Sequence, residues 1–264
     1  MEFLDFCKRY PHLYPNEALE FYAVFDDKEF KPSLNDINYY IKELINSYDP
    51  NEFSVNDSEC KALIHYAKNS RLEFSINKYQ SRFKARKSFH SLINRGFLTL
   101  ELNNNLLFFK GYYAQNKVIF NSNYARFYFY FLKSLEKIIL KDKDLAFSII
   151  SNNFNNYLSY IYEQIAKQWC EKNFNIKGIK SIWGKDYECD IFYNNYELSL
   201  LGEVKFKGKK MCLSSYSRLL QKAKYLGFEP DYFVLFSQSG FSNKLLSLND
   251  KRLILANHES FFKS

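Results

Sequence analysis

The feature that most constrains the fold is a run of apolar residues near the C-terminus, Tyr232 to Ser237, with the sequence YFVLFS. A short, wholly apolar run of this kind is typical of a strand buried on both faces, because both of its alternating sets of side chains need cover. The residues before it alternate between helical and strand patterns. The chain is therefore expected to end in a layered α/β domain.

The elements of this domain follow from periodicity and turn residues. A helix is predicted over 157–172, strands over 179–183, 188–193 and 200–206, and a helix over 214–226 that Gly227 ends before the apolar strand. The order is αβββαβ, and we predict that the domain covers residues 156–264.

Two of the predicted strands carry residues capable of chemistry. Side chains alternate with a period of two along a strand, so Glu203 and Lys205 project to the same face. In an antiparallel hairpin, the preceding strand brings Asp190 opposite that pair. Glu163 on the helix before the hairpin supplies a further carboxylate if its face packs there, and Glu188 is a reserve ligand.

These residue types suit phosphodiester hydrolysis. Carboxylates hold Mg²⁺ or Mn²⁺ together with substrate phosphate and water, and a lysine positions the attacking water and opposes the developing negative charge. We predict Asp190, Glu203 and Glu163 as metal ligands and Lys205 as the residue that acts on the water. The alternative is a solvated hairpin face, since D-x(12)-E-x-K arises by chance among 29 acidic and 37 basic residues.

The preceding sequence divides into three predicted regions. Residues 1–55 form a helical segment, with helices over 16–25 and 35–47. Residues 56–120 follow the winged helix-turn-helix order, and residues 121–155 form connecting helices. Within the winged helix we expect a helix over 60–68 capped by Ser58, a second short helix, and a helix over 84–94 ended by Gly96. A hairpin follows, with strands over 97–102 and 106–110 around a turn at 103–105.

Positive charge gathers in the winged-helix region. Residues 71–96 contain seven basic residues and one acid, which accounts for most of the chain's net charge of +8. Such clustering favours DNA as the partner, because phosphate contacts supply affinity. The alternative is a solvated helix face. The predicted nucleic-acid-binding residues are Lys78, Arg82, Lys84, Arg86, Lys87 and Arg95.

Several stretches resemble a known family. Residues 183–191, 202–205, 232–237 and 240–241 are similar to the C-terminal domain of archaeal-type AAA+ ATPases, which belongs to the PD-(D/E)xK nuclease-like group. Residues 92–98 and 120–131 resemble the end of the recognition helix and the aromatic segment that precede that domain in the family. The similarity leaves the first 55 residues unexplained.

The resemblance implies a restriction-endonuclease-like fold. It matches Glu163 to the helix glutamate, Asp190 to the metal aspartate, and Glu203 with Lys205 to the E-x-K. The sequence departs from the family at Cys189, where an aliphatic residue or proline is usual, and we expect no ATPase domain within its 264 residues. No P-loop spacing is present, so ATP binding by that route is not expected.

The remaining patterns exclude other classes. Five scattered cysteines without a C-x-x-C pair argue against a disulfide framework and favour the cytoplasm, and four separated histidines disfavour a zinc hydrolase. Charges interrupt residues 124–140, so no membrane partner is expected there. The leading hypothesis is a metal-dependent DNA endonuclease. The alternative is a non-catalytic DNA-binding or regulatory module, and a separately encoded ATPase is a further possible partner.

Overall fold

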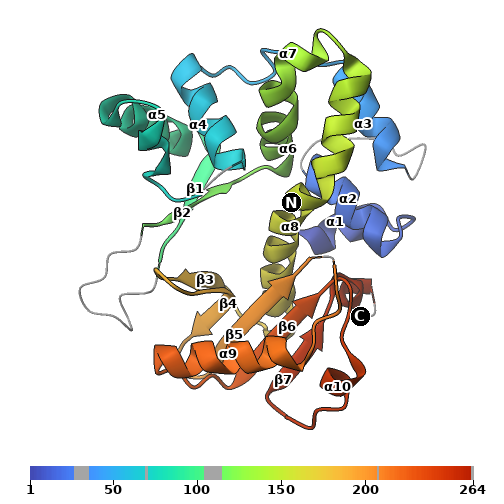
Figure 1. Ribbon diagram of the computed structural model, residues 1–264, viewed down its shortest axis with the longest axis vertical. Helices are drawn as coiled ribbons and strands as arrows, with labels where there is room; N and C mark the ends of the chain where they lie inside the picture. Colours follow the sequence, from blue (N-terminus) through green and yellow to red (C-terminus); the bar gives the residue numbers. More distant parts are fainter. Residues whose placement is uncertain (27–35, 69–70, 104–114, 207, 263–264) are drawn as a thin grey trace. The chain divides into compact units, whose positions relative to one another are not determined.

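The computed structural model describes residues 1–26, 36–68, 71–103, 115–206 and 208–262, which fold into a mixed α/β protein with a helical N-terminal half (Figure 1). The chain forms two compact units. Unit 1 contains Met1–Leu102 and Gln115–Asn155, and unit 2 contains Asn103–Ala114 and Asn156–Ser264. None of the described helices combines the length and the apolar character that crossing a membrane requires.

Unit 1 is mostly helical. Its elements are α1 (Phe3–Arg9), α2 (Pro15–Phe25), α3 (Ile37–Asn46), α4 (Asp57–Lys68), the 3₁₀ turn η1 (Ser75–Lys78), α5 (Arg82–Asn94), β1 (Leu98–Glu101), β2 (Lys117–Phe120), α6 (Asn123–Phe127), the π-helical η3 (Tyr128–Leu132), the 3₁₀ turn η4 (Lys133–Leu135) and α7 (Glu136–Ile139). The predicted helices over 16–25 and 84–94 are present within α2 and α5.

The structure corrects one detail of the region from α4 to β2 and establishes one strand pair there. The Asn56 side chain, rather than that of Ser58, caps α4, because its Oδ1 accepts the amides of Ser58 and Glu59, each at 3.0 Å. Strand β1 pairs in antiparallel fashion with β2. The expected partner strand over 106–110 lies outside the described residues, so β2 is the partner that the structure establishes.

The boundary between the units falls inside a helix that the sequence pattern had divided in two. Helix α8 (Lys143–Phe174) is continuous over 32 residues, whereas separate helices were predicted before 155 and from 157. The apolar stretch over 124–140 is also not a single helix. It consists of α6, η3, η4 and α7, because the hydrogen-bonding pattern changes at Tyr128 and again at Lys133.

Unit 2 is built on a five-stranded sheet. Its elements after α8 are β3 (Lys180–Trp183), β4 (Glu188–Asn194), β5 (Ser199–Lys205), α9 (Leu213–Leu226), β6 (Tyr232–Ser237), α10 (Asn243–Leu246), β7 (Leu253–Ala256) and the 3₁₀ helix η5 (His258–Phe262). The strand order is β3-β4-β5-β6-β7. Strands β3, β4 and β5 are antiparallel neighbours, whereas β5, β6 and β7 run parallel.

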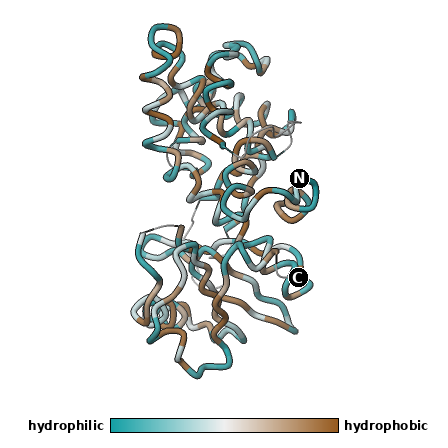
Figure 2. Tube along the Cα trace, turned by 90° about the vertical axis from the view of Figure 1, so that its right-hand side faces the viewer, coloured by the Kyte–Doolittle hydropathy of each residue, from teal (hydrophilic) through white to brown (hydrophobic). Residues whose placement is uncertain are grey.

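Helices cover both faces of this sheet. Tyr216 and Leu219 of α9 pack with Phe233 and Leu235 of β6 in one buried cluster. On the opposite face, Tyr162 and Trp169 of α8 contact the ring of Phe236. Much of the strand trace is correspondingly brown in Figure 2. The apolar strand is therefore buried on both faces, as its sequence predicts. The sequence patterns did not identify α10 or β7.

Candidate functional site

Asp190 lies at an irregularity of strand β4. Phe192 pairs with Lys180 and Cys189 pairs with Ile182, so two residues of β4, Asp190 and Ile191, lie opposite the single residue Ser181. This is a β-bulge, which locally bends a strand and redirects side chains. As a consequence, Cys189 and Phe192 both pack into the buried cluster beneath α9, although simple alternation places them on opposite faces.

The pairing of β4 with β5 ends at the same place. The last pair is Ile191 with Gly202, and the amide of Val204, two residues farther along β5, is bound by a side chain instead. Asp190 Oδ2 accepts a hydrogen bond from the backbone N–H of Val204 at 2.8 Å. The carboxylate is thereby fixed between the two strands, beside Glu203. The sequence predicted that these two residues meet, but not the bulge.

The electrostatic environment of Asp190 is unusual. Burial, followed by the negative charges of Glu163, Glu203 and Glu188, raises the pKa of Asp190 to about 8, against the opposing effect of the Val204 hydrogen bond. Helix α8 contributes Glu163, so carboxylates from a helix and two strands act on one group. A carboxyl that resists ionisation among other carboxylates is typical of an acidic cluster that a cation would relieve.

Glu203 is held by a residue of α9. Lys222 Nζ donates to Glu203 Oε2 at 2.6 Å and to the backbone carbonyl of Glu188, also at 2.6 Å. Burial acts to lower the pKa of Lys222, but the hydrogen bond and charge of Glu203 outweigh it and the net shift is upward. The sequence placed Lys222 on this helix without assigning it a specific contact.

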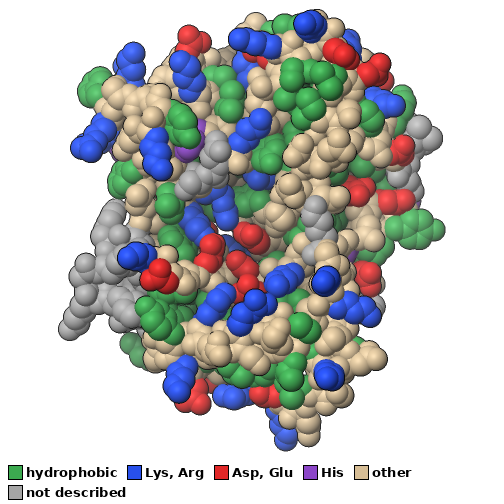
Figure 3. All heavy atoms as spheres, in the orientation of Figure 1, with side chains coloured by type: hydrophobic (Ala, Val, Ile, Leu, Met, Phe, Trp, Pro, Cys, Tyr) green, Lys and Arg blue, Asp and Glu red, His purple; other side chains and the backbone are tan. Residues whose placement is uncertain are grey.

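A small polar cavity adjoins these groups. Its volume is about 220 Å³, and it is lined by Glu203, Lys205, Ser215, Arg218 and Lys222. Three of these side chains are cationic, so the cavity favours an anion next to the carboxylates. Figure 3 shows acidic and basic side chains gathered side by side over β4 and β5.

The donor set suits a magnesium-like cation. Asp190 and Glu203 offer carboxylate oxygens, the ligands that Mg²⁺ and Mn²⁺ prefer, and Mg²⁺ usually completes its shell with water and substrate phosphate. Among the described residues, no group of three or more His, Cys, Asp or Glu side chains has an arrangement that holds a metal ion. The negative charge of Glu163 contributes to the raised pKa of Asp190.

The basic residues of α5 and its flanks differ in their surroundings. Lys78, Arg82, Lys84, Arg86 and Lys87 are exposed, and Lys and Arg side chains project over the α4 and α5 region in Figure 3. Arg95 is exposed as well, but it donates from Nη1 to Glu59 Oε2 at 3.0 Å and from Nη2 to the Ser54 carbonyl. Its guanidinium thus ties α5 to the start of α4, a role that the sequence did not predict.

Glu59 depends on that contact because its side chain is only 4% exposed. Burial acts to raise the pKa of Glu59, but hydrogen bonds from Ser91 and Asn56 and the charge of Arg95 outweigh it and hold the pKa below its usual value. We expect Arg95→Met to destabilise unit 1 by about 2 kcal/mol near pH 7, since it leaves a buried carboxylate without its cationic partner.

Chemical denaturation measures this effect, and the loss should shrink as the pH falls below the ordinary pKa of glutamate, where Glu59 becomes protonated in the unfolded chain. Arg86→Met is the matched control, because it removes the same charge from an exposed position of α5 and should cost under about 0.5 kcal/mol. Equal losses in the two variants would contradict the assignment.

Comparison with known proteins gives a match to a protein family. Residues 127–215 match the model of the DUF234 family, described as archaeal and bacterial proteins of unknown function. The matched range contains Glu163, Asp190, Glu203 and Lys205, so it covers the carboxylates and the lysine of the site. No curated protein and no solved structure matches the chain.

Proposed function

We propose that unit 2 hydrolyses phosphodiester bonds of DNA with the help of a divalent cation. The observation that carries this proposal is the position of Asp190 at the end of the β4–β5 ladder, next to Glu203 and within electrostatic reach of Glu163. A cluster of carboxylates that raises the pKa of one member, beside a cationic cavity, is suited to binding a cation together with a phosphate group.

The topology of unit 2 supports the same proposal. Helix α8, the antiparallel strands β3 to β5, helix α9 and the parallel strand β6 follow the αβββαβ order of restriction-endonuclease-like domains. In that arrangement the carboxylates lie where the second and third strands separate, and Glu203 and Lys205 lie on the third strand. The fold alone does not establish an activity, so the proposal depends on the site residues.

Each residue of the site has a separate role in the proposed reaction. Asp190 and Glu203 would hold Mg²⁺ or Mn²⁺, which lowers the pKa of bound water and neutralises charge on the phosphoryl group. Lys205 orients the water and opposes the charge that develops on the phosphate, and Arg218 binds a non-bridging oxygen. In the net reaction, water forms a new P–O bond, the P–O bond to the leaving oxygen breaks, and the proton passes to that oxygen.

We further propose that the segment from α4 to β2 is a winged helix that binds DNA through α5. Its order of helix, 3₁₀ turn, helix and antiparallel strand pair supports this, as do the exposed cations on and beside α5. Phosphate contacts by Lys84, Arg86 and Lys87 would give affinity that falls steeply with salt. Neutralising Arg86 and Lys87 should weaken binding without changing the chemistry at Asp190.

Incubation of the purified protein with supercoiled, linear and single-stranded DNA, in Mg²⁺, Mn²⁺ or EDTA, tests the nuclease proposal. We expect cation-dependent cuts that are reduced about 100-fold or more in Lys205→Ala, because positioning and charge stabilisation contribute several kcal/mol to such reactions. Lys210→Ala is the charge-matched control, because Lys210 is exposed, and this variant should retain activity. Cleavage that persists in Lys205→Ala counts against the assigned site.

One observation favours a second candidate, a non-catalytic DNA-binding module. Glu203, one of the two proposed cation ligands, already forms an ion pair with Lys222 at 2.6 Å. In such a module, DNA binding persists under every condition without cuts, it is lost when Arg86 and Lys87 are neutralised, and it is unaffected by substitutions at Asp190 or Lys205. The same incubation, with a binding assay beside it, separates the two functions.

A further inference from the structure

A second and larger cavity lies in unit 1, where η1 and the segment before it face α5. Its volume is about 500 Å³, within the range of about 300 to 1,000 Å³ that is typical of small-ligand pockets. All the residues that line it come from positions 73–90. The cavity therefore belongs to the basic segment and not to the carboxylate site.

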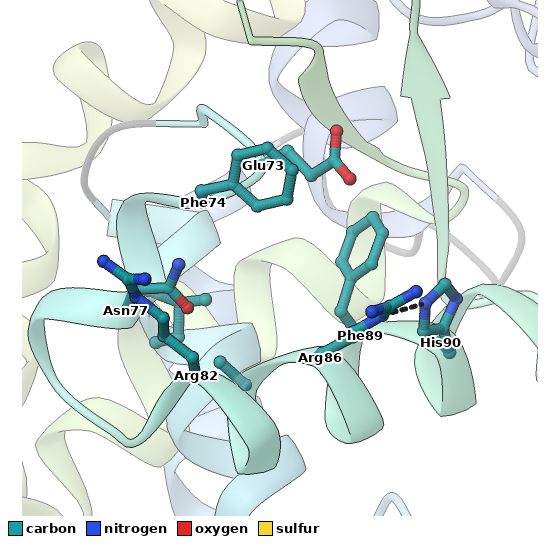
Figure 4. Close-up of a pocket in the computed structure, with 9 residues that line it drawn as sticks. Glu73, Phe74, Asn77, Arg82, Arg86, Phe89 and His90 are labelled. Carbon is teal, nitrogen blue, oxygen red and sulfur yellow. Dashed lines mark hydrogen bonds between the residues drawn. The ribbon is translucent and has the colours of Figure 1, made fainter.

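The lining of this cavity is largely apolar and partly aromatic. Ile76, Ala85 and Phe89 are buried and form its apolar wall, while the Phe74 side chain remains exposed at 45%. Phe74 and Phe89 come from opposite sides of the cavity (Figure 4). Two ring faces beside an open space suit a flat, aromatic ligand, because such ligands stack on aromatic side chains.

Polar groups of both signs surround the apolar wall. Arg82 and Arg86 are one turn apart on α5 and both line the cavity, with Arg86 Nε 3.4 Å from His90 Nε2. Glu73 lies on the opposite side (Figure 4). The cavity thus offers two guanidinium groups for an anion and one carboxylate for an amino group.

The side of the cavity opposite α5 is fixed by hydrogen bonds. The Glu73 amide donates to the Asn116 carbonyl and the Phe74 amide donates to Gln115 Oε1, both at 2.9 Å. The Tyr66 hydroxyl donates to the Glu73 carbonyl at 2.7 Å. Because these bonds hold the backbone of Glu73 and Phe74, a ligand meets a largely preformed site, which reduces the entropic cost of binding.

We propose that this cavity binds one unstacked nucleotide. The base lies against the rings of Phe74 and Phe89, the phosphate is bound by Arg82 and Arg86, and Glu73 accepts a hydrogen bond from an amino group of the base. The nucleotide is either free in solution or part of a strand in which that base has left the helical stack. This inference goes beyond cleavage and does not depend on activity at Asp190.

Binding of three short DNA duplexes tests whether the cavity takes a nucleotide that is part of a strand. The Asp190→Ala variant is used for these measurements, because the substitution prevents cleavage. One duplex is fully paired, one has a single unpaired nucleotide, and one has an abasic residue at that position. We expect the duplex with the unpaired nucleotide to bind about tenfold more tightly than the duplex with the abasic residue, because only the former has a base that can stack on an aromatic side chain. Fluorescence anisotropy measures the three affinities.

Two matched pairs of variants assign the effect to the cavity. Phe74→Ala should remove the preference for the unpaired base, whereas Phe83→Ala should not, because Phe83 is 79% exposed on α5 and does not line the cavity. Changing Arg82 and Arg86 to alanine should abolish the preference. Changing Lys84 and Lys87 should weaken all three duplexes equally, since it removes the same charge outside the cavity.

Binding of nucleoside monophosphates tests whether the cavity takes a nucleotide that is free in solution. If they bind, and Phe74→Ala or the double arginine variant prevents that binding, the cavity takes a free nucleotide even where the three duplexes bind equally. Equal affinity for all three duplexes together with no binding of monophosphates overturns the proposal. A base preference that survives Phe74→Ala, or one that Phe83→Ala removes as well, overturns it too.

Discussion

Asp190→Asn should reduce the rate of cation-dependent cleavage by about 1,000-fold or more. The same substitution should increase the stability of the metal-free protein. The loss follows because the carboxylate is a proposed ligand of a cation that contributes several kcal/mol to the reaction. The gain in stability follows because asparagine carries no charge next to Glu163 and Glu203, and its side-chain oxygen still accepts the Val204 amide.

The extra stability of Asp190→Asn should increase as the pH rises. The pKa of Asp190 is raised in the folded protein, so folding retains a proton that the unfolded chain releases. Stability that depends on this proton is present at low pH and is lost as the pH rises from about 4 towards about 8. The advantage of Asp190→Asn should therefore be small near pH 4 and reach several kcal/mol near pH 8, since one pKa unit corresponds to about 1.4 kcal/mol.

Thermal unfolding in EDTA at several pH values measures this gain. Asp186→Asn is the matched control, since it removes the same charge from an exposed position just before β4, and it should change neither cleavage nor stability. Added Mg²⁺ should raise the melting temperature of the unmodified protein but not that of Asp190→Asn. A variant that is less stable than the unmodified protein at pH 8 contradicts the assigned environment of Asp190.

Gly202→Ala should be the most damaging single-methyl change in the sheet. A Cβ at this position would lie 2.7 Å from the Val234 carbonyl oxygen and 3.0 Å from Ile191 Cβ. The carbonyl belongs to the backbone of β6, so the contact cannot be relieved by a side-chain rotation. We expect a loss of about 3 kcal/mol, at the upper end of the usual cost of overpacking, with displacement of Glu203 and loss of cleavage.

Gly240→Ala gives a comparison in which space is not limiting. Nothing lies within 4 Å of a Cβ at Gly240, although its φ of +74° disfavours alanine, so the expected loss is about 1 kcal/mol. Denaturant unfolding of both variants measures the difference. Equal losses would show that close approach of β5 and β6 at Gly202 does not restrict that position.

Most of unit 2 follows from local patterns. The strands β3 to β6 and the helix α9 have clear periodicity, and Gly227 adopts the left-handed conformation that ends α9. Strand β7 was missed because its pattern spans only four residues, Leu253–Ala256, without a marked alternation. The continuity of α8 was missed because its polar residues near Asn155 and Asn156 resemble a boundary.

The candidate site was only partly predictable. The spacing of Asp190, Glu203 and Lys205 indicated two neighbouring strands, and the structure places Asp190 beside Glu203. The bulge at Asp190 depends on pairing with β3, and the contact between Lys222 and Glu203 depends on how α9 packs. Such tertiary relationships have no signal in local periodicity. The same holds for Arg95, whose partner Glu59 is distant in the sequence.

The hydrogen bond from the Val204 amide to Asp190 makes one backbone proton a spectroscopic probe of the site. The resonance frequency of that proton depends on whether its acceptor is charged, neutral or bound to a cation. Heteronuclear magnetic resonance of Val204 would thus follow ionisation of the carboxyl group and titration with Mg²⁺ in the absence of any substrate. Amide exchange at the same position would show how often the two strands open there.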